Sequence, residues 1–124
     1  MQIISVIIPT YNHHGREPDL LNLINSLLST SNSTFIGEII IVDNGNSLSA
    51  GKLETIDERI KIVSESRIGL NYARNAGISR AVLDIISFVD DDVTVSSGWA
   101  KSIMDGHTNS DVLCVGGPVL ATDK

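Results

Sequence analysis

The sequence predicts an α/β fold, with a doubly wound, mostly parallel sheet and helices on both faces. Short apolar runs rich in β-branched residues alternate along the chain with segments of helical spacing, and strands separated by helical crossovers pair in parallel. Polar residues follow the apolar runs directly at their C-terminal ends. In a parallel sheet these ends meet at one edge, where open α/β sheets bind their ligands.

The first strand is predicted at Ile3–Ile8, a β-branched run that ends at Pro9. Pro18-Asp19 then opens a helix. The apolar residues of this helix recur at helical spacing: Leu20, Leu21, Leu23, Ile24, Leu27 and Leu28. The second strand is predicted at Glu38–Val42, and it closes with the turn residues Asp43-Asn44-Gly45.

A short helix is predicted around Gly51–Asp57, and a third, weaker strand follows at Ile60–Val63. Leu70–Leu83 has helical spacing and carries small residues that favour close packing on a sheet: Ala73, Ala76, Gly77 and Ala81. The apolar run Ile85–Val89 is long enough for a buried fourth strand.

The last two predicted elements are a helix at Ser97–His107 and a fifth strand at Val112–Val115, which ends in Gly116-Gly117-Pro118. Cys114 lies within this apolar stretch and is predicted to be a small core residue. A single cysteine forms no disulfide within the chain, which favours a reducing compartment.

The composition is that of one ordinary globular domain, which we place at residues 1–124. Nine Lys and Arg against fifteen Asp and Glu give a net charge of −6, which argues against a nucleic-acid surface. No apolar run approaches the roughly 18 residues of a membrane-spanning helix. We therefore predict no transmembrane segment and a soluble, cytoplasmic protein, with peripheral contact to the inner face of the membrane left open.

Three consecutive carboxylates, Asp90-Asp91-Asp92, follow the predicted fourth strand. Adjacent carboxylates repel one another, and a cation, a proton or open water must relieve that repulsion. Mg²⁺ or Mn²⁺ would do so, because these ions prefer oxygen ligands and bind through one or two carboxylates plus substrate phosphates. The alternative is an acidic surface turn that water solvates.

Three polar strand ends should share the same edge of the sheet: Pro9-Thr10-Tyr11-Asn12, Asp43-Asn44 and Asp90-Asp91-Asp92. Taken singly, the first two are also good turn sequences. Arg74 lies on the helix before the acidic strand, and its planar guanidinium suits a diphosphate. The alternative for Arg74 is an exposed side chain or one paired with an Asp of the triplet.

Four blocks of this sequence resemble, in order and spacing, those of the family 2 inverting glycosyltransferases, which have the GT-A nucleotide-sugar-binding fold. The blocks are Ser5–Asn12, Glu38–Gly45, Gly69–Gly77 and Phe88–Asp92. The resemblance covers nearly the whole chain. It implies a transferase that binds a nucleoside diphosphate sugar, with UDP the expected nucleotide, together with Mg²⁺ or Mn²⁺. The sugar would pass, with inversion, to a hydroxyl of a saccharide or lipid-linked acceptor.

The resemblance also implies roles for residues at the ends of the first two strands. Thr10 and Tyr11 would lie beside the base and ribose, with Pro9 in the same donor-binding set. Asp43 would accept a hydrogen bond from the base, usually uracil.

For the phosphates and the metal, the resemblance points to the acidic triplet. Asp92 matches the metal-ligating end of the family's Asp-x-Asp motif, and Asp90 matches its first acid. Asp91 would lie close to the ribose or the metal-bound water, and Arg74 would approach the diphosphate. A metal bridging both phosphates would neutralise the leaving group.

Two departures from the family pattern qualify this interpretation. Many members carry a second Asp where this chain has Asn44, which makes uridine a less secure assignment. Members also continue into an acceptor-binding half that supplies the general base, so we expect the base beyond Lys124 and expect this chain to be a donor-binding portion with little activity alone.

The runner-up is a non-catalytic nucleotide-binding or interaction module that kept the fold and lost the chemistry. Two other classes fit less well. A phosphoacceptor receiver domain would carry its acid pair after the first strand, where this chain has Pro9–Asn12. A dinucleotide-binding domain would carry Gly-x-Gly-x-x-Gly there, and the motif is absent.

Overall fold

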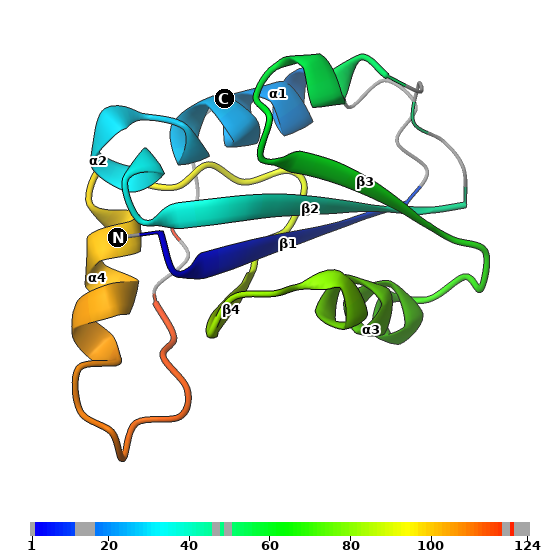
Figure 1. The fold of residues 1–124 in the computed structure, drawn as a ribbon. Coiled ribbons are helices and arrows are strands. Elements are labelled where there is room, and N and C mark those ends of the chain that lie inside the picture. The colour runs from blue at the N-terminus through cyan, green and yellow to red at the C-terminus, as the bar shows by residue number, and fades with distance from the viewer. Residues whose placement is uncertain (1, 12–16, 46–47, 49–50, 118–119, 121–124) are drawn as a thin grey trace.

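The computed structural model describes residues 2–11, 17–45, 48, 51–117 and 120, and within them four parallel strands form one sheet (Figure 1). The strands are β1 (Ile4–Tyr11), β2 (Ile36–Asn44), β3 (Ile60–Glu65) and β4 (Ile85–Phe88), in the spatial order β3-β2-β1-β4. The helices are α1 (Glu17–Leu27), α2 (Thr30–Ser33), α3 (Leu70–Arg80) and α4 (Trp99–Gly106), with a 3₁₀ turn, η1, at Leu53–Thr55.

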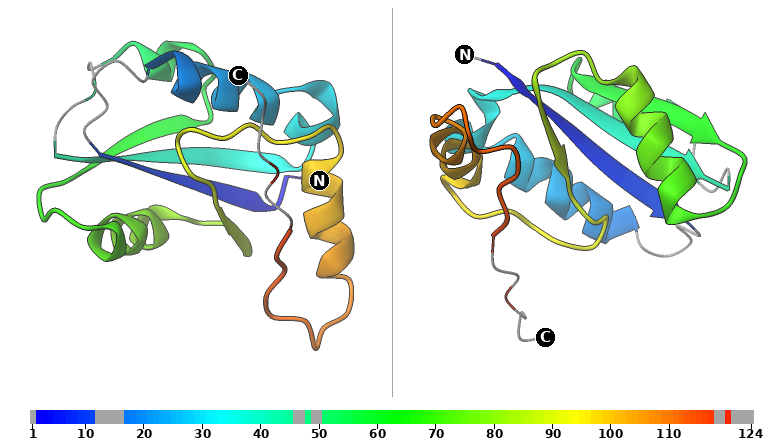
Figure 2. Two further views of the ribbon diagram at one scale, coloured as in Figure 1. Left: turned by 180° about the vertical axis from the view of Figure 1, so that it is seen from behind. Right: turned by 90° about the horizontal axis from the view of Figure 1, so that it is seen from below.

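The strand order makes this a doubly wound sheet. From β1 the chain moves outward to β2 and β3, and it then returns to the other side of β1 to form β4. α1 lies on one face of the sheet and α3 on the opposite face, so the two directions of winding use different faces (Figures 1 and 2). The predicted fold class is confirmed, and the topological switch point lies between β1 and β4.

Each face of the sheet has its own hydrophobic core, because side chains alternate along a strand. Toward α1, the larger core includes Ile4, Val6 and Ile8 of β1 with Leu20 and Ile24 of the helix. Toward α3, the smaller core consists of Ile7, Ile40, Val42, Val63 and Ala73. The central strands β1 and β2 are buried on both faces, which explains why their sequences are near-continuous apolar runs.

α3 lies close to the sheet, as its small residues predict. Ala73 and Gly77 are its buried residues. A Cβ on Gly77 would stand only 2.4 Å from Cγ2 of Ile7 on β1. Glycine at this position therefore allows the helix backbone to approach the strand more closely than alanine would.

β1 continues through Pro9 to Tyr11, three residues beyond its predicted end. The amide of Val89 donates to the carbonyl of Ile7 at 3.0 Å, and the pairing of β1 with β4 ends at Ile7. Because backbone groups alternate in direction along a parallel strand, the position of Pro9 faces the side on which β4 has already ended. A proline is tolerated there, since no ladder hydrogen bond needs its missing N–H.

The predicted fifth strand is wrong. Within the part of the chain that the structure describes, Val112–Val115 forms no strand, and Cys114 is exposed rather than a core residue. An apolar run becomes a strand only when it pairs with a neighbour, and β4 pairs in the described sheet with β1 alone. Pro118, which was expected to end the strand, lies outside the described residues.

Candidate functional site

The predicted site residues come together at the carboxyl ends of β1, β2 and β4. Thr10 is opposite Asp43 in the β1–β2 register. The hydroxyl Oγ1 of Thr10 donates to Oδ2 of Asp91, just after β4, at 2.7 Å. This buried hydrogen bond joins residues 81 positions apart in the sequence and spans the switch point between β1 and β4. It holds the acidic triplet beside the end of β1.

Two of the carboxylates at this edge are buried. Asp43 is 5% exposed and Asp91 is 8% exposed. Oδ2 of Asp43 accepts a hydrogen bond from the amide of Leu48 at 3.4 Å. Burying a carboxylate in a protein costs free energy unless hydrogen bonds or a positive charge compensate it. Their burial distinguishes both carboxylates from those of a fully solvated turn, and the hydrogen bonds from Thr10 and from the amide of Leu48 help to compensate it.

The acidic triplet alternates in exposure: Asp90 and Asp92 are exposed, while Asp91 between them is buried. All their donor atoms are oxygens, which fits Mg²⁺ or Mn²⁺ better than softer metals. Among the described residues, no group of three or more His, Cys, Asp and Glu side chains is placed to hold a metal. The two exposed carboxylates, Asp90 and Asp92, are oxygen ligands of the kind that Mg²⁺ combines with phosphate and water.

Arg74 of α3 lies against Phe88, the last residue of β4, which precedes the acidic triplet by two positions. Its guanidinium stands over the ring of Phe88, 5.5 Å from the ring centroid. Its Nε is buried and makes no hydrogen bond. An unsatisfied donor on a cation is costly to bury, so this atom is suited to an anionic acceptor. The alternative of an Arg74–Asp pair in the triplet does not occur among the ion pairs of the described residues.

Tyr11 and Pro9 complete the predicted set, and Asn12 lies outside the described residues. Tyr11 ends β1 opposite Asn44 and is 46% exposed, so its ring is accessible at the sheet edge. A Cβ on Gly45 would stand 3.4 Å from Cδ1 and Cε1 of that ring. Gly45 has a φ of +105°, a conformation that favours glycine.

Asn44 is a residue whose role sequence reasoning missed. Its side chain is 2% exposed and bonds the segment that follows β3. In the sequence it appears as the middle residue of the turn Asp43-Asn44-Gly45 and as a departure from the family pattern, and neither indicates this role. No local signal identifies its partners, because they lie between 21 and 25 residues further along the chain.

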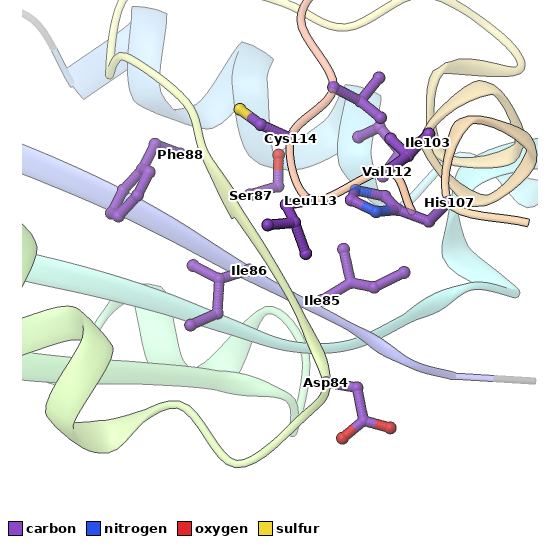
Figure 3. A pocket seen from close by; sticks show the side chains of 11 residues that line it. Asp84, Ile85, Ile86, Ser87, Phe88, Ile103, His107, Val112, Leu113 and Cys114 are labelled. Atoms are coloured by element: carbon purple, nitrogen blue, oxygen red, sulfur yellow. The ribbon is translucent and has the colours of Figure 1, made fainter. Parts of the chain in front are cut away.

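A groove lies along β4 and reaches Phe88, over which the guanidinium of Arg74 stands. This groove has a volume of roughly 670 Å³ and is lined by residues of that strand, of α4 and of the segment after α4, including Asp84, His107, Leu113 and Cys114 (Figure 3). We call it the β4-edge groove. None of the residues predicted to bind the nucleotide sugar or the metal lines it.

The described architecture and the polar residues at its switch point define a doubly wound α/β domain with a candidate binding edge. Residues 5–124 match the model of the family described as Glycosyl transferase family 2. The chain belongs to this family of glycosyltransferases, an enzyme family, as the resemblance implied.

Relatives and a solved structure agree with this membership. A glucosyl-dolichyl phosphate glucuronosyltransferase of Haloferax volcanii is 25% identical over 122 residues, which cover 94% of this chain and 38% of that protein. The uncharacterized glycosyltransferase EpsJ of Bacillus subtilis is 33% identical over 118 residues, covering 92% of this chain and 33% of EpsJ. The crystal structure of S. aureus TarS 1-349 shares the fold, with a TM-score of 0.62 and 24% identity over 85% of this chain and 32% of that one. The chain thus spans about a third of the length of these proteins.

None of the helices in the described part of the chain is long and apolar enough to cross a membrane. The cytoplasmic location stays a prediction.

Proposed function

We propose that this chain is the donor-binding portion of a glycosyltransferase that uses a nucleoside diphosphate sugar, with UDP as the nucleotide and Mg²⁺ or Mn²⁺ as the cofactor. The observation that carries the proposal is the Thr10–Asp91 hydrogen bond across the switch point. It places two exposed carboxylates, Asp90 and Asp92, beside the ends of the strands that carry Tyr11 and Asp43.

In this proposal each residue of the edge has a separate task. Tyr11 packs against the base and ribose, beside Pro9 and Thr10. Asp43 accepts a hydrogen bond from an N–H of the base. The buried Nε of Arg74 donates to the diphosphate, for which the planar guanidinium is well suited.

The acidic triplet has two tasks in the proposal. Asp90 and Asp92 would hold the metal ion, and Asp91 keeps their loop in place through Thr10. When bound, the ion neutralises charge on the diphosphate, so that it can leave without being protonated. An acidic chain, with a net charge of −6, would otherwise repel a bare diphosphate.

The transfer step forms one bond and breaks another. The oxygen of the acceptor hydroxyl attacks the anomeric carbon from the face opposite the leaving group, the bond from that carbon to the diphosphate oxygen breaks, and a general base takes the hydroxyl proton. The name of the H. volcanii relative includes glucosyl-dolichyl phosphate, which supports a lipid-linked saccharide as the acceptor class. The general base is not among the residues we assign.

Calorimetric titration with UDP tests the proposal. We expect UDP to bind roughly tenfold or more tightly with Mn²⁺ than after chelation by EDTA, because the ion is the largest local charge at such a site. Equal affinity in both conditions would remove the metal from the proposal. Absence of UDP binding in both would contradict the donor-binding function.

A further inference from the structure

Asn44 fastens the segment between β3 and α3 to the end of β2. Its amide nitrogen Nδ2 donates to the carbonyl oxygens of Glu65 at 2.9 Å and Arg67 at 2.8 Å. Its oxygen Oδ1 accepts from the amide of Gly69 at 3.0 Å. All three partners are backbone groups. We call these three hydrogen bonds the Asn44 clip, and together they fix the backbone conformation from residue 65 to residue 69.

The chemistry of this clip requires an amide. A carboxylate at position 44 has no donor for the two carbonyl oxygens and would face them with negative charge. An alanine leaves the same two carbonyls and one N–H without their partner. The clip therefore depends on the amide group of Asn44 and would not form with an aspartate at this position.

The clipped segment places Ile68 at the edge of the candidate site. The point where a Cβ of Gly45 would stand is 3.4 Å from Cδ1 of Ile68 and 3.4 Å from the ring of Tyr11. Ile68 and Tyr11 thus both lie beside Gly45, and both are about half exposed. A side chain at residue 45 would contact both of them, so glycine leaves their exposed surfaces uncovered.

We propose that Asn44 is a positioning residue for recognition of the nucleotide base. It holds Ile68 close to Tyr11, and these two half-exposed side chains would line an apolar slot beside Asp43 for the flat base. Asn44 itself does not touch the base, because its buried amide is bonded to the 65–69 segment. This inference rests on the proposed function.

The slot and the acidic triplet are separate parts of the same edge, and they recognise different parts of the ligand. Loss of the clip should weaken contacts to the base and leave contacts to the diphosphate intact. Loss of a residue with only a general structural role would instead weaken the contacts to the base and the contacts to the diphosphate together. Binding of inorganic pyrophosphate with Mn²⁺ therefore serves as the internal reference for binding of UDP with Mn²⁺.

The experiment compares four variants with the parent chain by calorimetry and thermal unfolding. Asn44→Ala and Asn44→Asp remove the clip, and the alanine variant does so without adding a charge that repels phosphate. Ile68→Ala removes one wall of the slot and leaves the clip in place. Asn25→Asp makes the same chemical change as Asn44→Asp at an exposed position of α1 and is the matched control.

We expect Asn44→Ala and Ile68→Ala to bind UDP roughly tenfold more weakly, the scale of loss that one missing apolar contact produces in a ligand pocket. Both should bind pyrophosphate within about twofold of the parent, and Ile68→Ala should unfold at the parent temperature, because its side chain is 54% exposed. Asn44→Asp should lose UDP affinity at least as strongly as Asn44→Ala. Asn25→Asp should match the parent in every measurement.

Different outcomes overturn different claims. If the parent chain binds UDP and both Asn44→Ala and Ile68→Ala bind it equally well, the slot is wrong and the donor-binding function stands. If Asn44→Ala loses UDP and pyrophosphate to the same extent, Asn44 has a general structural role and the inference fails. If the parent binds UDP no more tightly than it binds pyrophosphate, both with Mn²⁺, the base adds no affinity. The slot and the base-reading role of Asp43 then both fail.

Discussion

Replacing Asp92 by alanine should remove most of the gain in UDP affinity that Mn²⁺ gives, a loss of about tenfold or more, because losing even a group that supports a metal ligand typically costs about 10–100-fold in metal affinity. Asp92 is exposed next to Asp91, whose carboxylate is already bonded to Thr10. Asp91 is therefore poorly placed to substitute for it. Asp92→Asn, which keeps the shape and removes the charge, should lose nearly as much.

The measurement is calorimetry with UDP in the presence of Mn²⁺ and again after chelation. Asp105→Ala is the matched control, since Asp105 is an exposed acid of α4 that pairs with Lys101 on the surface, and such pairs contribute little. We expect the control to bind as the parent does. If Asp92→Ala also binds the UDP–Mn²⁺ complex normally, the triplet is a solvated turn rather than a metal site.

Replacing Glu38 by glutamine should destabilise the fold by about 2–4 kcal/mol at neutral pH, because it breaks a buried charge network. Glu38 is 2% exposed on β2. Its carboxylate accepts hydrogen bonds from the hydroxyl of Ser5, the amide of Val82 at 2.7 Å and Nζ of Lys61 at 2.9 Å. All three partners are donors. In a glutamine, an NH₂ group replaces one of the two accepting oxygens, so at least one partner would face another donor and lose its hydrogen bond.

The pH dependence of this effect follows from the pKa of Glu38. Burial raises that pKa, but the hydrogen bonds from Ser5, Val82 and Lys61 and the charge of Lys61 outweigh burial and hold it below its ordinary value of 4.5. A carboxyl group with a lowered pKa stabilises the fold above the ordinary value, and that contribution is lost as the pH falls through the lowered one.

Urea unfolding of the parent and of Glu38→Gln at a series of pH values measures both effects. The difference in unfolding free energy should be constant from pH 7 to about pH 5 and shrink below that, as Glu38 of the parent becomes protonated. Glu54→Gln, at an exposed position of η1, should show a difference near zero throughout. A difference that grows on acidification would contradict the assigned direction of the pKa shift.

The sequence predicts this fold correctly where the hydrophobic pattern of a segment matches the burial of that segment in the structure. The central strands β1 and β2 are buried on both faces, and a near-continuous apolar sequence is typical of that environment. β4 is also predicted as a buried strand, but its residues are only partly buried or exposed, because it pairs in the described sheet with β1 alone. Val112–Val115 has the same pattern and forms no strand in the described chain. Hydrophobic pattern alone does not say whether a run finds a strand to pair with.

The site was predictable as a place but not as a set of contacts. Parallel strands bring their carboxyl ends to one edge, so the meeting of Thr10, Asp43 and the acidic triplet follows from topology. The Thr10–Asp91 bond and the Asn44 clip depend on side-chain geometry between segments far apart in the sequence. A turn sequence such as Asp43-Asn44-Gly45 carries no sign of such partners. The roles assigned to these residues in donor binding stay predictions.

The most direct test of the central claim, that the carboxyl edge of the sheet binds the metal–diphosphate complex, is a nuclear magnetic resonance titration with Mn²⁺ and UDP. Mn²⁺ broadens nearby amide signals, and the effect falls steeply with distance, while Mg²⁺ with UDP serves as the diamagnetic reference. We predict selective broadening of signals from residues 89–93 and from Thr10 and Tyr11, with signals of the β4-edge groove, including His107 and Cys114, affected less. Broadening centred on that groove, with residues 89–93 unchanged, would contradict the account.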